Sequence, residues 1–202
     1  MTKSFFVSDQ HFSHFKIIEY CNRSFSSITE MNDTIINNHN SVVTSADDVY
    51  ILGDFAFVNN IQSFDNIINQ LNGRKFFILG SHDRIVEHNL KYLLRHFVWI
   101  KEKAEIKINK QDITLCHYPM WSWAKSHYGS WQLFGHHHGR LNSDHRSPDK
   151  INLTDRLQLD VGVDCWNFSP VSFEQIKEIM DKKNFVPIHK RKKINDQSIE
   201  CG

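Results

Sequence analysis

The chain has 202 residues, of which 40% are apolar, so it is long enough for one domain with a sizeable core. Its 24 Lys and Arg balance 23 Asp and Glu, which argues against a protein drawn to nucleic acid by overall charge. The sequence shows no signal-peptide pattern, no apolar run long enough to span a bilayer and no C-x-x-C pair, so we expect a cytoplasmic protein with free thiols and no membrane partner.

Strands and helices are predicted to alternate in the first half of the chain. Three apolar runs predict strands at residues 4–7, 49–52 and 76–79. Between them, apolar residues recur at three- and four-residue steps over 28–43 and 61–71, which predicts two amphipathic helices. Thr29 is the expected N-cap of the first helix, and Asn72 follows the second. This alternation is typical of an α/β fold.

The second half predicts more strands and fewer helices. A short helix is expected at 92–97, followed by strands in antiparallel hairpin style at 98–101, 104–109 and 113–116. Alternating apolar residues predict a last strand within 157–163, and Ser172 is the expected N-cap of a helix that runs to Met180. We therefore expect one domain over residues 1–187 and a basic, then polar, flexible tail over 188–202.

Five motifs rich in His and Asp each lie at or near the end of a strand-like run. They are Asp9-Gln10-His11, Gly53-Asp54, His82-Asp83, Cys116-His117 and Gly135-His136-His137-His138-Gly139. Open α/β sheets place their sites at the carboxyl ends of the strands, so these side chains are expected to meet. Two divalent ions about 3.5–4 Å apart need a bridging carboxylate and further imidazole or carboxylate ligands. The pattern therefore predicts a two-metal site for phosphoester hydrolysis.

The order of these motifs resembles that of the calcineurin-like metallophosphoesterases, over the chain from Ser4 to about Met180. Small bacterial and phage members are especially similar, with shared strings near residues 21–23, 117–120 and 160–164. The resemblance implies a four-layer α/β/β/α sandwich that holds two divalent ions, with manganese favoured over iron, zinc or nickel. It also implies a phosphodiesterase or phosphatase acting on a small phosphoester, with nucleotides the leading guess.

The same resemblance assigns roles to individual residues. The implied ligands are Asp9, His11 and His138 for the first metal, Asp54 as the bridge, and His117 and His136 for the second metal. His82 would stabilise the transition state or protonate the leaving oxygen, with Asp83 orienting its ring. A metal-bound hydroxide would be the nucleophile. Strand alternation points His137 away from its two neighbours, so it is not assigned a role.

Ser81 is the one departure from the family pattern. The family motif is G-N-H-[D/E], in which the Asn carbonyl binds the second metal, whereas this chain has Gly80-Ser81-His82-Asp83. A serine hydroxyl has a shorter reach and is a poor neutral ligand for a divalent ion. Ser81 remains a candidate ligand, and the second metal site is expected to be the weaker one.

Three residues outside the metal ligands are candidates for substrate binding. Arg23, His14 and Arg84 are predicted to meet a substrate phosphate, because the fork of an arginine suits two oxygens. The alternative for each of them is a solvated helix face. Four aromatic residues between the fourth and fifth motifs either pack in the core or stack a nucleobase: Trp121, Trp123, Tyr128 and Trp131.

Two rival functions stay open. A nuclease acting on RNA or DNA ends is the first, although the neutral net charge disfavours it. The second is a binding module that keeps the fold but has lost catalysis, and Ser81 alone supports it. No feature of the sequence predicts an oligomeric state.

Overall fold

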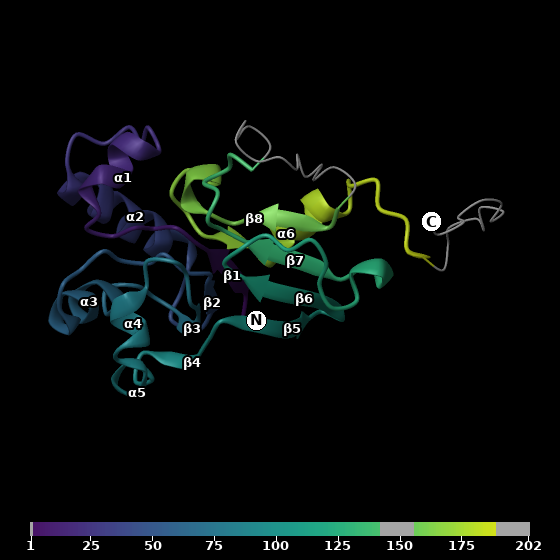
Figure 1. Ribbon diagram of the computed structural model, residues 1–202, viewed down its shortest axis with the longest axis horizontal. Helices are drawn as coiled ribbons and strands as arrows, with labels where there is room; N and C mark the ends of the chain where they lie inside the picture. Colours follow the sequence, from purple (N-terminus) through teal and green to yellow (C-terminus); the bar gives the residue numbers. More distant parts are fainter. Residues whose placement is uncertain (1, 142–155, 189–202) are drawn as a thin grey trace, which may run out of the picture.

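The computed structural model describes residues 2–141 and 156–188, and in that part of the chain two β-sheets are flanked by helices (Figure 1). The first sheet has the order β4 (Phe97–Lys101), β3 (Arg74–Ile78), β2 (Asp48–Ile51), β1 (Ser4–Val7) and β9 (Val171–Ser172). The second has the order β5 (Lys103–Ile108), β6 (Gln111–Cys116), β7 (Trp131–Phe134) and β8 (Gln158–Asp160). This architecture confirms the predicted α/β sandwich.

Parallel pairing dominates both sheets. Strands β1 to β4 are parallel to one another, and only β9 runs antiparallel at the edge of the first sheet. In the second sheet β6, β7 and β8 are parallel, and β5 pairs antiparallel with β6. The sheets are tied together just beyond β1, where the Ser8 amide donates to the Val161 carbonyl (3.1 Å) and the Val163 amide donates to the Ser8 carbonyl (3.0 Å). The loops after β1 and β8 are therefore held side by side.

Most helices of the described chain are short, and a side-chain N-cap starts three of the six. They are α1 (Phe15–Tyr20), α2 (Ile28–Val42), α3 (Ile61–Ile68), α4 (Arg84–Glu87), α5 (Leu90–Leu93) and α6 (Phe173–Met180). Ser27, not Thr29, is the N-cap of α2, because its side chain accepts from the Glu30 amide at 3.1 Å. The predicted cap of α6 is confirmed, since Ser172 and Gln175 form a capping box.

Two apolar cores hold these layers together. In the first, α2 and α3 pack Met31 and Phe64 against one face of the first sheet, where Phe77 is fully buried. In the second, the other face of that sheet meets the second sheet, and α6 adds Phe173, whose ring stacks on Trp131 with centroids 5.5 Å apart. A fully buried side chain of this size contributes about 1.5–3 kcal/mol, so the cores fix the strand ends firmly.

Several sequence-based expectations are wrong in detail. β4 does not form a hairpin with β5; it pairs parallel with β3 in the first sheet, with Ile100 opposite Phe77. Strand β7, which begins at Trp131, was not predicted, whereas the burial of Trp131 agrees with the core-packing alternative. The helix expected at 92–97 is replaced by α4 and α5.

Some of the predicted segments cannot be compared with the structure. Residues 189–202 of the predicted tail and residues 142–155 of the predicted domain lie outside the described residues. Within the described ranges, no helix is long and apolar enough to cross a membrane.

Candidate metal centre

The five motifs come together in the loops that follow β1, β2, β3, β6 and β7, as parallel strands require. Their side chains form two adjacent groups of potential ligands. The first group is Asp9, His11 and His138, and the second is Asp54, His117 and His136. Within each group the ligand atoms lie within 4.8 Å of one another, so each could hold one metal ion.

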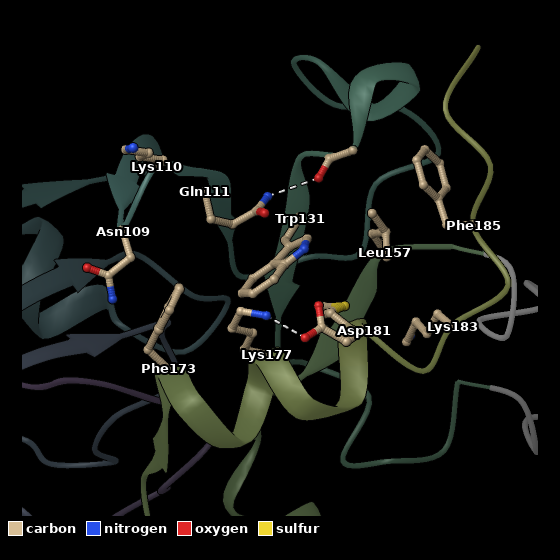
Figure 2. A pocket seen from close by; sticks show the side chains of 12 residues that line it. Asn109, Lys110, Gln111, Trp131, Leu157, Phe173, Lys177, Asp181, Lys183 and Phe185 are labelled. Atoms are coloured by element: carbon tan, nitrogen blue, oxygen red, sulfur yellow. Dashed lines mark hydrogen bonds and ion pairs between the residues drawn. The ribbon is translucent and has the colours of Figure 1, made fainter. Parts of the chain in front are cut away.

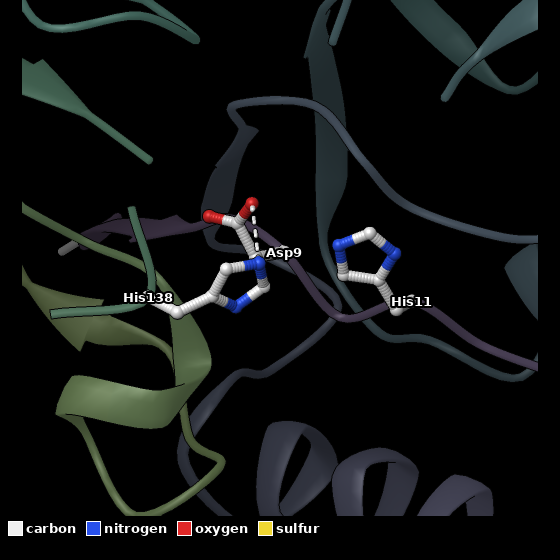
Figure 3. A group of neighbouring side chains, drawn as sticks. All are labelled: Asp9, His11 and His138. Carbon is white, nitrogen blue, oxygen red and sulfur yellow. Dashed lines mark ion pairs between the residues drawn. The ribbon is translucent and has the colours of Figure 1, made fainter. Parts of the chain in front are cut away.

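The first group joins the loop after β1 to the loop after β7 (Figure 3). Asp9 Oδ1 lies 3.9 Å from His138 Nε2, and the rings of His11 and His138 stack with centroids 5.3 Å apart. Figure 3 shows the Asp9 carboxylate and the two imidazoles facing a common space. The Asp9 carboxylate also accepts hydrogen bonds from the backbone amide of His136 at 3.0 and 3.1 Å.

Asp54 lies between the two groups. Its Oδ2 is 3.7 Å from His11 Nε2 and 3.4 Å from His117 Nε2. This carboxylate is therefore within 4 Å of one imidazole from each group, a position that a shared ligand would require. Ser81 Oγ donates to Asp54 Oδ2 at 3.0 Å, and the backbone amide of His82 donates to Asp54 Oδ1 at 2.8 Å, so the carboxylate is held in place from one side.

Two buried ring nitrogens at this centre lack hydrogen-bond partners among the described residues: His11 Nε2 and His117 Nε2. An unsatisfied buried polar atom costs about 1–3 kcal/mol, so such atoms are rare without a reason. Two ligand atoms bound to one cation at about 2.1 Å lie roughly 3–4.2 Å apart, which matches their separations from Asp54. The His117 ring is already fixed through Nδ1, which is 2.8 Å from the Leu52 carbonyl. The residues present therefore fit a pair of divalent cations.

The backbone is strained at these same positions. Five of the six potential ligands have a positive φ: Asp9 (58°), His11 (51°), Asp54 (52°), His136 (72°) and His138 (50°). Residues other than glycine rarely adopt this left-handed conformation, and a residue held there costs on the order of 1–3 kcal/mol. Backbone strain of this kind clusters at functional sites. Here the strained residues belong to the same two groups as the ring nitrogens without hydrogen bonds.

Two glycines allow the loops to approach closely. A Cβ on Gly135 would overlap the Asp9 carboxylate, and a Cβ on Gly80 would overlap that of Asp54. Both motifs therefore need glycine because a ligand carboxylate occupies the space of the missing side chain.

A buried ion pair supports the first group. Arg23 donates from Nε and Nη2 to the two oxygens of Asp164, both at 2.8 Å, and from Nη2 to the Asp9 carbonyl at 2.7 Å. Asp164 Oδ2 lies 2.7 Å from His138 Nδ1 and orients that imidazole. The prediction that Arg23 meets a substrate phosphate is wrong, because its side chain is fully buried and its donors are turned to these partners.

Asp83 has a different role from the predicted one. Its buried carboxylate accepts from the backbone amides of Gly80 (2.7 Å), Asp54 (2.8 Å) and Phe55 (3.0 Å). These donors already occupy both oxygens, and no hydrogen bond to the His82 ring accompanies them in the described part of the chain. Asp83 therefore fixes the loop that carries Asp54 and does not orient His82.

Burial and charge shift the ionisation of the potential ligands in opposite directions. Burial raises the pKa of Asp9 to about 7, although nearby imidazoles lower it in part. Burial lowers the pKa of His11 to about 2. Burial also lowers the pKa of His138, but hydrogen bonding to Asp164 and Cys21 outweighs it and raises the value to about 10. Strong pKa shifts of opposite sign among neighbouring buried acids and imidazoles are typical of functional sites, including sites that bind a cation.

A cavity of about 370 Å³ opens over the two groups. His82, which is exposed, and His14, which is half-buried, line it together with His11, Asp54, His136 and His138. The His82 ring centroid lies 5.6 Å from that of His11, and His14 Nδ1 is 3.4 Å from His11 Nδ1. His82 and His14 therefore lie beside the two groups of potential ligands, and their roles toward a substrate stay predictions. Arg84 is exposed and lines a neighbouring cavity.

Comparisons with known proteins place the chain among relatives of similar length. The uncharacterized protein MJ1445 of Methanocaldococcus jannaschii is 34% identical over 187 residues, which are 92% of this chain and 96% of that protein. The chain belongs to the family of MJ1445. The gene 66 protein of Mycobacterium phage L5 is 25% identical over 199 residues, with 90% of this chain and 95% of that protein covered.

A solved structure shares the fold. The protein of unknown function AQ665 from Aquifex aeolicus superposes with a TM-score of 0.66 at 22% identity, over 89% of this chain and 100% of that one. No family model matches the chain. The match to MJ1445 covers 92% of this chain.

Sequence reasoning missed three residues at this centre. Asp164 and Cys21 form a group with His138, and Tyr118 packs its ring against His117 and His136 with centroids 4.9 and 4.8 Å away. All three lie in the sequence strings shared with small metallophosphoesterases, but no spacing or motif connects them to the potential metal ligands.

Another cavity, of about 510 Å³, lies at the opposite end of β7 (Figure 2). Trp131 and Phe173 form part of its wall, and Lys177 on α6 pairs with Asp181, four residues further along the chain, at its edge. None of the groups of potential metal ligands found in the described residues lines this cavity. The potential metal ligands of the described chain therefore gather at the carboxyl ends of the strands.

Proposed function

We propose that this protein is a metal-dependent phosphoester hydrolase that uses two divalent cations to act on a small phosphodiester or phosphomonoester, with nucleotides the favoured class. The observation that carries the proposal is the position of Asp54 between His11 and His117, each with a buried Nε2 that makes no hydrogen bond in the described chain and lies 3.7 or 3.4 Å from Asp54 Oδ2. That arrangement suits one carboxylate shared by two cations. The resemblance of the motif order to the calcineurin-like metallophosphoesterases supports it.

In this proposal the two groups divide the work of holding the cations. Asp9, His11 and His138 would hold one, His117 and His136 the other, and Asp54 would contact both. When bound, such ions lower the pKa of a water molecule and draw charge from phosphate oxygens. Imidazole and carboxylate ligands suit manganese as well as iron, zinc or nickel.

His82 is the candidate proton donor. Its backbone amide is anchored to Asp54, so its exposed ring is presented at the mouth of the cavity beside His11. An imidazole there can give a proton to the leaving oxygen as the phosphorus–oxygen bond breaks. Ser81 takes the place of the family's asparagine and donates to Asp54, so it shapes the second group without supplying a carbonyl ligand.

The size and charge of the site favour a small substrate. The cavity of about 370 Å³ falls in the range of small-ligand sites. The chain has a net charge of only +1, whereas contacts along a nucleic-acid strand need a basic track.

The proposal is tested by metal analysis combined with turnover. Protein dialysed against manganese should hold two ions per chain and hydrolyse bis(4-nitrophenyl) phosphate. Asp54→Asn should lower metal affinity by more than the roughly 10–100-fold typical of losing a supporting residue. His82→Ala should keep both ions and lose about 10²–10⁴-fold in turnover.

Two outcomes would contradict the proposal in different ways. Wild-type protein that binds two ions without turnover on any phosphoester would favour the binding module. Protein that binds no manganese would remove the metal centre altogether.

A further inference from the structure

Two cavities meet at the candidate proton donor. The cavity over the metal ligands shares Phe57, Ser81 and His82 with a second cavity of about 450 Å³. The second cavity extends away from the metal ligands and is lined otherwise by Ala56, Val58, Asn59, Arg84 and Ile85. A group attached to the oxygen that His82 protonates would therefore extend into this second cavity.

Phe57 forms a fixed aromatic wall between the two cavities. Its ring stacks on His14 with centroids 4.5 Å apart and an interplanar angle of 22°, and it meets His82 edge-on at 6.2 Å. Its backbone amide donates to the Phe12 carbonyl at 2.8 Å, which fixes the start of the wall to the loop after β1. The side chain is nevertheless 51% exposed. An aromatic ring held on one side and open on the other is a platform for stacking a planar group.

Arg84 provides an unpaired positive charge at the other wall. Its exposed side chain makes no hydrogen bond or ion pair with another residue in the described ranges. The carboxylate next to it in sequence, Asp83, is buried and turned to backbone amides. A guanidinium in this setting can bind an anion such as a phosphate through two donors.

We propose that this second cavity, the Phe57–Arg84 subsite, binds the leaving part of the substrate and selects a nucleotide, with the base on Phe57 and a further phosphate at Arg84. The inference rests on the proposed function, because it is His82 that places the leaving oxygen at the junction of the cavities. In the reaction, water supplies the new oxygen on phosphorus, the bond to the leaving oxygen breaks, and that oxygen receives a proton from His82. A volume of about 450 Å³ suits one nucleotide.

The subsite is tested with two isomeric dinucleotides that differ only in which side carries the base. One has adenine on the first sugar and an abasic second sugar, and the other has the reverse order, so charge and bond chemistry are matched. Product analysis on manganese-loaded wild-type protein identifies which oxygen leaves. We expect a higher kcat/KM for the isomer whose leaving sugar carries adenine, by about 5–100-fold.

Phe57 variants separate stacking from a structural role. Phe57→Ala should abolish the preference by lowering kcat/KM for the base-bearing isomer while the abasic one changes little, and Phe57→Trp should keep the preference. Phe15→Ala is the matched control, because Phe15 is 67% exposed but lines neither cavity. An equal loss on both isomers in Phe57→Ala, or no preference in the wild type, would overturn the subsite.

Arg84 is tested by a terminal phosphate on the leaving nucleotide. Arg84→Gln should remove the advantage of that phosphate, which we expect to be about 2–5-fold for an exposed pair. A phosphate advantage that survives in Arg84→Gln would contradict the second half of the inference.

Binding distinguishes failure of the subsite from failure of the proposed function. If no phosphoester is hydrolysed, calorimetric titration of AMP into manganese-loaded wild type and Phe57→Ala still tests the platform. Weaker binding by about 5-fold or more in the variant supports the subsite. Equal affinity of the two proteins for AMP overturns it.

Discussion

His39 and His117 are both buried histidines, with exposed fractions of 2% and 0%, but they belong to different regions of the molecule. His39 lies on α2 in the framework, where Nε2 is 3.0 Å from the Asn72 carbonyl. His117 follows β6 at the candidate metal centre, where Nδ1 is 2.8 Å from the Leu52 carbonyl. Of these two residues, only His117 has a second ring nitrogen that is buried and makes no hydrogen bond within the described chain, and this nitrogen lies 3.4 Å from Asp54 Oδ2. That nitrogen, rather than burial or a carbonyl partner, separates a candidate ligand from a packed histidine.

The largest expected effect comes from exchanging the same side chain in both regions. His117→Gln should lower manganese affinity by more than the roughly 10–100-fold that a supporting residue contributes. His39→Gln should leave manganese affinity unchanged but lower the free energy of unfolding by about 1–2 kcal/mol, because it disturbs a packed position on the buried face of α2. Metal content after dialysis and urea unfolding in chelator measure the two quantities.

These two variants also test the comparison itself. The wild-type protein in chelator is the reference for stability, so that metal binding does not contribute to the unfolding free energy. If His39→Gln loses manganese as strongly as His117→Gln, the unpartnered nitrogen is not what marks the ligand.

The next effect is the pH dependence of stability that His39 contributes. Burial lowers the pKa of His39 from 6.5 to about 4. Between pH 6.5 and pH 4, His39 is therefore protonated in the unfolded chain but neutral in the folded chain. Its contribution is fully present above pH 6.5 and is lost as the pH falls toward 4, by at most about 3 kcal/mol. The advantage of wild type over His39→Gln, about 1–2 kcal/mol at pH 7.5, should therefore shrink by roughly 2–3 kcal/mol and reverse in sign by pH 4.5 in urea unfolding. A gap independent of pH would show that His39 is not kept neutral by the fold.

The smallest effect concerns Ser81, which stands where the calcineurin-like metallophosphoesterases have an asparagine. Ser81→Asn should offer a carbonyl to the second group and tighten the binding of the second manganese by about 10-fold, the lower end of what one supporting group contributes. Ser81→Ala is the control, since it removes the donor to Asp54 without adding a ligand and should weaken that ion. Manganese stoichiometry and turnover that do not change in Ser81→Asn would discard the idea.

The fold was predictable where the signal is local. Strand ends and the amphipathic stripes of α2 and α3 follow from spacing, and the parallel order of β1 to β3 brings their carboxyl ends together. The partner of β4 was not predictable in this way, because a short strand can pair with either neighbour and only the full sheet decides. Thr29 and Ser27 lie two residues apart and both suit an N-cap, so the choice depends on where the chain enters α2.

At the candidate centre, too, local features were predictable and long-range contacts were not. The sequence predicted which side chains gather, because each follows a strand, and the structure brings all six potential ligands together. It could not predict what Arg23 and Asp83 touch, since these contacts depend on burial and on groups far away in the chain. Arg23 and Asp164 are separated by 141 positions, and no local pattern connects them.

That separation has a consequence for how the protein is made. The candidate ligands Asp9 and His11 are synthesised early, whereas Asp164, which orients His138, follows its partner Arg23 by 141 positions. Until residue 164 has been made, Arg23 and His138 both lack the carboxylate that they share. The proposed centre is therefore expected to bind cations only after residue 164 has been added, and fragments cut before that residue should bind manganese poorly.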